Sequence, residues 1–432
     1  MGRERAFFQG ARLGAVAMLD YHRLGTVPAK HHIQLKRPKA DPAADGCPVY
    51  YEHCITRKGF DGAYSIAYRR NNPAMEVGSR PAKLTDTFQP ANDAAGQPLR
   101  RRHLVTPGLA GKGTLWESLR IVAGNEDVRL GTSQPTVADS GLVANGDGDL
   151  LLFLHEGSGV LSSELGDVEL RRHDYVWIPR GLIHRIRFAK GPVHVLWMEC
   201  RSGLEIPSNF RNPTGQLRMD APYSHRDFRR PHQLSSPDKP AQKDGTKEGF
   251  VVLLKRGDRY TERILPHHPF DVVGWDGTAY PVAFNIHDYQ PKTGLVHLPP
   301  PIHTTFLGGK GSFVICSFVP RKLDYHPEAI PCPYPHSSVD CDELLWYVEG
   351  QFASRKGVGP ASITLHPAGI PHAPQPGRYE ASFGALQTDE MAVMVDTFKP
   401  LHVTAWGAKA EDPAYHGSWV TGSAGKGGNY VD

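Results

Sequence analysis

The sequence lacks several features that would point to particular classes of protein. None of its six cysteines lies in a Cys-x-x-Cys pair, so neither a zinc ribbon nor a redox dithiol is indicated. No stretch approaches the roughly 20 apolar residues that a membrane span needs, and no convincing secretory signal is present. The formal charge of +4, from 49 basic and 45 acidic residues, is too small for this length to argue for nucleic-acid binding. We therefore expect a cytoplasmic protein with reduced thiols that binds neither nucleic acid nor membrane.

The composition favours strands over helices. With 45 glycines and 37 prolines among 432 residues, the chain suits many short strands that are joined by turns. This length is enough for two or three domains, or for two fused barrels. Because strand-like alternation recurs along the chain, we predict an all-β fold of double-sheet jelly rolls.

Two stretches share one plan, which is a strand, a turn, a second strand and then a Pro-x-Gly-x-x-His turn. The first stretch runs from Asp149 to His184, and the second runs from Glu343 to His372. Proline fixes φ and glycine allows positive φ, so the turn sets the backbone just before its histidine. This internal repeat predicts two barrels that arose by duplication.

The second copy carries a candidate metal site. His336 and Glu343 come just before the apolar run 344–348, and His372 follows the alternating run 362–366. If these two strands lie side by side, two imidazoles and one carboxylate can meet. That is the ligand set of the two-His-one-carboxylate triad, which leaves three positions of an octahedral Fe(II) open. A histidine in a proline-rich loop is more often structural, so the prediction depends on the three residues together.

The first copy lacks two of these partners. Asn145 occupies the region where a ligand histidine is expected, and Asp147 or Asp149 stands in place of the glutamate. His184 alone cannot hold iron. We therefore predict that the first barrel is a degenerate copy, kept for packing and oligomerisation.

These patterns predict three regions along the chain. Residues 1–18 form a disordered extension, and residues 19–230 form a loop-rich N-terminal domain with the degenerate barrel. A segment rich in proline and charge connects the halves. Residues 246–432 form the C-terminal catalytic barrel.

Three motifs carry a family resemblance: Asp324-Tyr325-His326-Pro327, Tyr334-x-His336-Ser337 and Val395-Asp396-Thr397-Phe398-Lys399-Pro400. Together with the spacing of Glu343, Gly350 and the Pro-x-Gly-x-x-His turn, they resemble the homogentisate 1,2-dioxygenases of the cupin superfamily. The resemblance is greatest to the shorter bacterial form and covers most of the chain.

The resemblance implies an extradiol-type ring cleavage in tyrosine and phenylalanine catabolism. It places Fe(II) on His336, Glu343 and His372, with a small aromatic acid and O2 as substrates and, for homogentisate, maleylacetoacetate as the product. His297 matches the family's His-x-x-Pro-x-Ile acid/base histidine, and His303 is the alternative. An imidazole suits this role because its unperturbed pKa is about 6.5. The family also forms trimers and hexamers.

Further side chains are candidates for positions beside the iron and the substrate. His366 matches a family histidine close to the iron, where it would orient a ligand or the substrate. Phe352 stands where the family has a substrate-contacting tyrosine, so a hydroxyl contact is missing. Tyr334, Tyr347 and Arg378 are the candidates to bind the substrate carboxylate instead, with Arg321 as a further option.

Three alternative functions remain open at this point. A gentisate-type or hydroxyanthranilate-type dioxygenase would use the same fold and metal. A non-catalytic bicupin that binds a small molecule would be expected to lose the ligands of both barrels. A metal-dependent sugar-phosphate isomerase would need further histidine ligands and phosphate-binding basic residues.

Overall fold

The computed structural model describes residues 19–43, 45–85, 88, 98–236, 249–298, 300–352 and 354–420. Within these residues the fold is nearly all β, and the only α-helices are α1 (Arg378–Ala381) and α2 (Ala405–Ala410). The prediction of an all-β chain is thus confirmed. No helix in this part of the chain is both long and apolar enough to cross a membrane. The predicted disordered extension at residues 1–18 lies outside the described residues.

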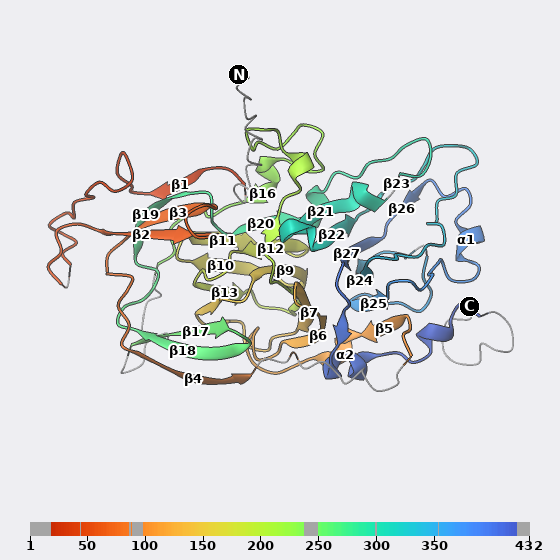
Figure 1. Ribbon diagram of the computed structural model, residues 1–432, viewed down its shortest axis with the longest axis horizontal. Helices are drawn as coiled ribbons and strands as arrows, with labels where there is room; N and C mark the ends of the chain where they lie inside the picture. The colour runs from red at the N-terminus through yellow and green to blue at the C-terminus, as the bar shows by residue number, and fades with distance from the viewer. Residues whose placement is uncertain are drawn as a thin grey trace, which may run out of the picture.

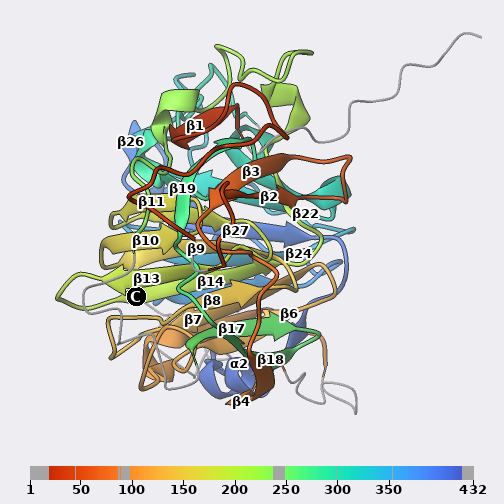
Figure 2. The ribbon, with the colours of Figure 1, turned by 90° about the vertical axis from the view of Figure 1, so that its left-hand side faces the viewer.

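The first barrel is built from two sheets, which occupy the left and centre of Figure 1. Figure 2 shows the seven-stranded sheet in its hydrogen-bonded order, β11 (Gly166–Leu170), β10 (Gly159–Ser163), β13 (His184–Phe188), β8 (Val143–Asn145), β17 (Phe250–Arg256), β18 (Arg259–Leu265) and β4 (Gly78–Thr85). The eight-stranded sheet has the order β16 (Phe228–Arg229), β20 (Val282–Asn285), β12 (Asp174–Ile178), β9 (Asp149–Glu156), β14 (His194–Cys200), β7 (Val128–Ser133), β6 (Arg120–Gly124) and β28 (His402–Val403). Leu161 and Ile186 of the first sheet share one core with Trp177 and Trp197 of the second.

The second barrel is centred on another seven-stranded sheet, to the right in Figure 1. Its order is β15 (Leu204–Glu205), β21 (Thr304–Gly308), β22 (Phe313–Phe318), β27 (Met391–Thr397), β24 (Asp342–Glu349), β25 (Ser362–His366) and β5 (Arg102–Val105). A small sheet pairs β23 (Arg321–Lys322) with β26 (Gln387–Thr388). A separate four-stranded sheet has the order β1 (His22–Gly25), β19 (Val272–Gly277), β3 (Tyr64–Arg69) and β2 (Tyr51–Thr56).

Strand pairing crosses the expected division between residues 230 and 246. Strands β17, β18 and β20 follow that division in the sequence, yet they lie in the sheets of the first barrel. In the opposite direction, β5 lies between β4 and β6 of the first barrel in the sequence but pairs with β25 of the second. Whether 19–230 and 246–432 are separate domains therefore stays a prediction.

The two Pro-x-Gly-x-x-His turns have the same backbone conformation at their glycines. Gly181 and Gly369 both have φ of 78°, in the left-handed region that a side chain disfavours. Each turn leads directly to its histidine, which is His184 at the start of β13 and His372 beyond β25. The structure therefore repeats, at this turn, the plan seen in the sequence.

Candidate metal centre and substrate pocket

The strand β24 divides its side chains between the core and a cavity. Leu344, Trp346 and Val348 are buried in the main hydrophobic core, whereas Glu343, Leu345 and Tyr347 line a cavity of about 780 Å³. This alternation follows from the two-residue period of a strand. Glu343 is thereby carried to the cavity wall by the same pattern that anchors β24 in the core.

A backbone bridge brings the two candidate histidine ligands together. The N–H of His336 donates to the carbonyl of His372 at 2.9 Å, and the N–H of His372 donates back at 2.9 Å. Their ring centroids are consequently 4.1 Å apart. The histidines before β24 and after β25 therefore meet across an antiparallel pair, as the spacing predicted.

Glu343 lies between these two rings. Its Oε2 is 3.8 Å from Nε2 of His336, and its Oε1 is 3.3 Å from Nε2 of His372. Burial on its own would raise the pKa of Glu343, but the adjacent His336, His366 and His372 hold it well below its usual range. The carboxylate in turn raises the pKa of His336. The trio thus presents an ionised carboxylate oxygen to two imidazoles.

The donor set fits a divalent metal ion. Nδ1 of His336 lies 3.1 Å from the Tyr334 carbonyl, an arrangement that favours a proton on Nδ1 and leaves Nε2 free to face Glu343. Both ring nitrogens of His372 are buried without a hydrogen-bond partner. A buried imidazole that has no partner is costly unless a ligand satisfies it. Two nitrogen donors and one oxygen donor suit several transition metals.

His366 contacts the carboxylate without lining the cavity itself. Its Nδ1 is 2.7 Å from Oε1 of Glu343, and its Nε2 is 3.1 Å from the hydroxyl of Tyr415. Glu343 and His366 are cross-strand partners on β24 and β25, which accounts for the contact. His366 is fully buried and is absent from the cavity lining. Its position is that of a residue that orients Glu343.

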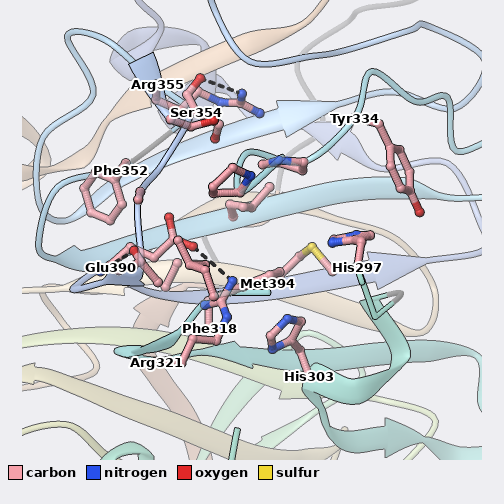
Figure 3. Close-up of a pocket in the computed structure, with 18 of the residues that line it drawn as sticks. His297, His303, Phe318, Arg321, Tyr334, Phe352, Ser354, Arg355, Glu390 and Met394 are labelled. Atoms are coloured by element: carbon pink, nitrogen blue, oxygen red, sulfur yellow. Dashed lines mark hydrogen bonds and ion pairs between the residues drawn. The ribbon is translucent and has the colours of Figure 1, made fainter. Parts of the chain in front are cut away.

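Every other predicted site residue lines the cavity. The set comprises His297, His303, Tyr334, His336, Glu343, Tyr347, Phe352, His372 and Arg378. Figure 3 shows His297 and Tyr334 on one side of the pocket, across from Arg355 and Phe352. The ring centroids of His297 and Tyr334 are 5.1 Å apart. These side chains surround a single space large enough for an aromatic acid.

The two acid/base candidates differ in environment. The side chain of His297 is 39% exposed, and its Nδ1 is 3.7 Å from Oδ2 of Asp324. His303 is buried against Phe318, with ring centroids 4.5 Å apart. Burial, with the nearby Arg321 and His297, lowers the pKa of His303 to about 3. His303 is therefore held neutral, whereas His297 reaches solvent.

The candidate substrate contacts also differ from one another. Tyr334 is half exposed at the cavity wall, while Tyr347 is buried and its hydroxyl is 2.9 Å from Oγ1 of Thr364. Phe352 packs edge-on against Tyr347, at 4.5 Å between centroids. Arg378 begins helix α1, and its Nε has no hydrogen-bond partner.

Sequence reasoning missed two polar residues in this pocket. Arg355 is buried at 7% exposure, and among the described residues no carboxylate forms an ion pair with it, although it donates to the carbonyls of Ser354 and Ala373. Asp396 is the cross-strand partner of Glu343, and its Oδ1 has no hydrogen-bond partner. Burial and the charge of Glu343 raise the pKa of Asp396 to about 7. Asp396 lay in a motif that carried the family resemblance, but Arg355 had no sequence signal at all.

The equivalent region of the first barrel is filled by ion pairs. Asn145 donates to Glu199, and Nζ of Lys255 lies 3.0 Å from Asp147 and 2.7 Å from Glu199. Asp149 pairs with Arg57 at 2.7 Å. Among the described residues, no grouping of potential metal ligands includes His184.

The relatives found by comparison with known proteins are named as dioxygenases. A family model described as Homogentisate 1,2-dioxygenase N-terminal matches residues 73–286, a range that ends before the pocket residues. A protein of Saccharolobus solfataricus, named provisionally as a dioxygenase, is 33% identical over 409 residues, which are 94% of this chain and 100% of that protein. Homogentisate 1,2-dioxygenase of Bradyrhizobium diazoefficiens is 29% identical over 280 residues, 62% of this chain and 59% of that enzyme. The chain therefore matches less than two thirds of the length of this homogentisate enzyme.

Matches among solved structures are more distant. A cupin 2 conserved barrel domain protein from Leptotrichia buccalis is 10% identical, covering 71% of this chain and 100% of that chain with a TM-score of 0.29. A glyoxylate-induced protein, provisionally so named, from Pseudomonas aeruginosa reaches a TM-score of 0.33 at 13% identity, over 75% of this chain and 95% of that chain.

Proposed function

Because this chain belongs to the homogentisate 1,2-dioxygenase family, we propose that it cleaves the ring of homogentisate or a closely related dihydroxyphenyl acid. One observation carries the proposal. His336, Glu343 and His372 converge on the wall of a cavity of about 780 Å³ that is lined by aromatic and cationic side chains. A dioxygenase of this family acts on a small molecule together with O2.

We propose that His336, Glu343 and His372 hold Fe(II). When bound, this ion supplies a redox-active centre with open positions for a phenolic oxygen and O2. The role of the chain is to fix the three donors. His366 holds one oxygen of Glu343 at 2.7 Å, and Tyr415 holds His366 from behind.

His297 is the proposed acid/base residue. It lines the cavity, it is 39% exposed, and Oδ2 of Asp324 lies 3.7 Å from its Nδ1. His297 would take the proton from the substrate hydroxyl at its Nε2 and return it after cleavage. His303 is assigned a packing role, because it is buried against Phe318 and its pKa of about 3 makes it a weak base.

Arg355 is the proposed anchor for the substrate carboxylate. A buried guanidinium that lacks a carboxylate partner is costly, and an acidic substrate would supply that partner. Tyr347 lies next to Arg355 in the pocket. Phe352 would pack on the aromatic ring in place of a hydroxyl contact. Arg378 and Tyr334 line the same cavity and are the remaining polar candidates.

With homogentisate as substrate, the product would be maleylacetoacetate, in the breakdown of tyrosine and phenylalanine. A cytoplasmic location and a trimeric or hexameric assembly are part of the same proposal. Exposed apolar side chains next to cavity-lining residues support an assembly, namely Tyr325 at 68%, Val339 at 71% and Leu386 at 79% exposure. Light scattering during size-exclusion chromatography would measure the subunit number.

Oxygen consumption by the purified chain tests the proposed reaction. After anaerobic loading with Fe(II), the protein is offered homogentisate, gentisate and 3-hydroxyanthranilate separately, and O2 uptake and ring-opened absorbance are recorded. We expect uptake and product with homogentisate, and loss of both in His372→Ala. A preference for gentisate or 3-hydroxyanthranilate would identify that compound as the substrate in place of homogentisate. Absence of O2 uptake with all three compounds would contradict the proposed function.

A further inference from the structure

The strand β24 carries one carboxylate at each end. Glu343 lies near its start, in the pocket described above, and Glu349 is its last residue. Glu349 extends toward the first barrel, where it meets His173, just before β12, and His287, in the 3₁₀ helix Ile286–Asp288. One potential ligand atom from each of these three residues lies within 4.8 Å of the other two.

His173 is held in an unusual position within this cluster. Its φ is +69°, in the left-handed region that non-glycine residues rarely adopt and that costs about 1 kcal/mol or more. Its side chain is only 3% exposed and its ring is parallel to that of Phe153. Nδ1 lies 3.0 Å from Nε2 of His287, and Nε2 lies 3.8 Å from Oε2 of Glu349 with no hydrogen-bond partner. The fold thus buries a constrained imidazole whose second nitrogen faces a carboxylate across a gap.

We propose that His173, His287 and Glu349 form a second metal site, which binds a divalent ion of the zinc class between the two barrels. Two imidazoles and a carboxylate are a common donor set for zinc, with water completing a tetrahedral shell. The 3.8 Å between Nε2 of His173 and Oε2 of Glu349 equals the separation of His336 and Glu343 in the pocket. His287 is exposed, so an ion can reach the cluster from solvent.

The surrounding charges permit this site. Arg172 lies 3.3 Å from Glu349, but it also lies 3.0 Å from Glu156. When Glu349 turns to an ion, Arg172 retains Glu156 as its partner. A second cluster in the first barrel, Asp147, Glu199 and Asp258, is different. Its carboxylates are already paired with Lys255, Arg129 and Arg201, so it offers no free ligand.

The site would join the two barrels directly. His173 and His287 flank strands β12 and β20 of the eight-stranded sheet, and Glu349 ends a strand of the other barrel. An ion bound only in the folded state stabilises that state in proportion to its occupancy. This role is independent of the reaction proposed for the pocket.

Measurement of the zinc bound per chain of the full-length protein tests the proposal. The pocket site is first removed by Glu343→Gln with His372→Ala, and the protein is loaded with Zn²⁺, passed through gel filtration and measured for bound zinc. We expect about one zinc per chain to remain, and none after the further change His287→Ala. We also expect added zinc to raise the melting temperature only when His287 is present. Co²⁺ loading, with its ligand-field absorption, reports the coordination independently.

His32→Ala is the matched control in the same background. His32 also has a positive φ and also contacts a carboxylate, Glu52 at 2.9 Å, but its ring is fully exposed. We expect this variant to keep its zinc. Absence of bound zinc before His287 is changed, or zinc content that His287→Ala leaves unaltered, would overturn the proposal and reduce the cluster to a hydrogen-bonded chain. Because His287 is exposed, the variant is expected to fold, which circular dichroism would verify.

Discussion

The two barrels share a turn but treat buried negative charge in opposite ways. In the first barrel, the ammonium of Lys255 lies within 3.0 Å of both Asp147 and Glu199. In the second, Glu343 faces three imidazoles and forms no ion pair with a lysine or arginine of the described residues. Where the chain supplies the cation, no ion is needed. Where it supplies only imidazoles, the carboxylate can be neutralised by a bound metal.

The histidines of the two turns show the same contrast. His184 has its Nδ1 2.9 Å from the carbonyl of Leu182, and its ring packs near Trp116. His372, at the equivalent turn position, has no hydrogen bond from either nitrogen. The two barrels therefore share a backbone turn whose histidines have different chemical roles. The neighbours of the histidine decide whether it packs or binds.

The largest expected effect is the loss of turnover when a pocket ligand is removed. His372→Ala should lower kcat/KM by about a thousand-fold or more, because a bound metal contributes several kcal/mol to the transition state. Bound iron and O2 uptake would be measured together. His184→Gln, at the equivalent turn, should keep its iron, and a loss of iron in that variant would break the comparison.

Removal of the internal cation should have the next largest effect, on stability. Lys255→Met leaves Asp147 and Glu199 buried without their ammonium, so the free energy of unfolding should fall by about 3 kcal/mol. This is the lower end of the usual range because Arg201 remains 2.8 Å from Glu199. Urea unfolding measures the change. Lys58→Met removes an exposed partner of Glu205 and should cost less than about 1 kcal/mol.

Arg355→Met, unlike Lys255→Met, should affect substrate binding more than stability. Because the guanidinium lacks a carboxylate partner in the described chain and loses only hydrogen bonds to carbonyls, its removal should lower stability less than Lys255→Met does. It should raise KM for the aromatic acid about 10- to 100-fold. The neutral amide of the same substrate should be turned over equally by both proteins. An equal loss for acid and amide would show that Arg355 only supports the loop.

Tyr415→Phe should have a smaller effect on the metal. The change removes the hydroxyl 3.1 Å from Nε2 of His366, and such outer contacts are typically worth about tenfold or more in metal affinity. Iron affinity would be measured by competition with a chelator. Tyr223→Phe, which loses a buried hydroxyl bonded to the carbonyl of Thr305, should leave that affinity unchanged.

The last prediction concerns the dependence of stability on pH. Burial lowers the pKa of His184 from 6.5 to about 4, so the unfolded chain binds a proton more readily than the folded one between these values. The histidine therefore reduces stability as pH falls from 6.5 to about 4, and it has no such effect above 6.5. His184→Gln should flatten the pH dependence of urea unfolding over that interval. An unchanged slope would mean that other buried histidines dominate it.

More of the candidate site could be predicted from sequence in the second barrel than in the first. The spacing of His336, Glu343 and His372 around two strand patterns was enough to predict that they meet, because strand periodicity and a fixed turn determine where they point. Tyr415 could not be assigned this way, since it reaches His366 from a distant C-terminal segment. Arg355 lies in an irregular loop without periodicity, so its burial depends on tertiary packing.

In the first barrel, the sequence predicted the loss of ligands but not what replaced them. Asn145 and the two aspartates were visible as departures from the ligand pattern. Lys255, however, comes from β17, which follows the expected division and pairs in parallel with β8. Parallel partners far apart in sequence leave no local pattern to read.

The exchange of strands between halves has a consequence for biosynthesis. During translation, β5 cannot pair with β25, and β6 cannot pair with β28, until those later strands have been synthesised. The edges of β5 and β6 that these strands cover stay exposed until then. Pairings between such distant segments form slowly, and uncovered edges invite association with other chains. Translation must therefore be nearly finished before this molecule can close, and a product truncated near residue 246 would expose the edge of β8 that β17 normally covers.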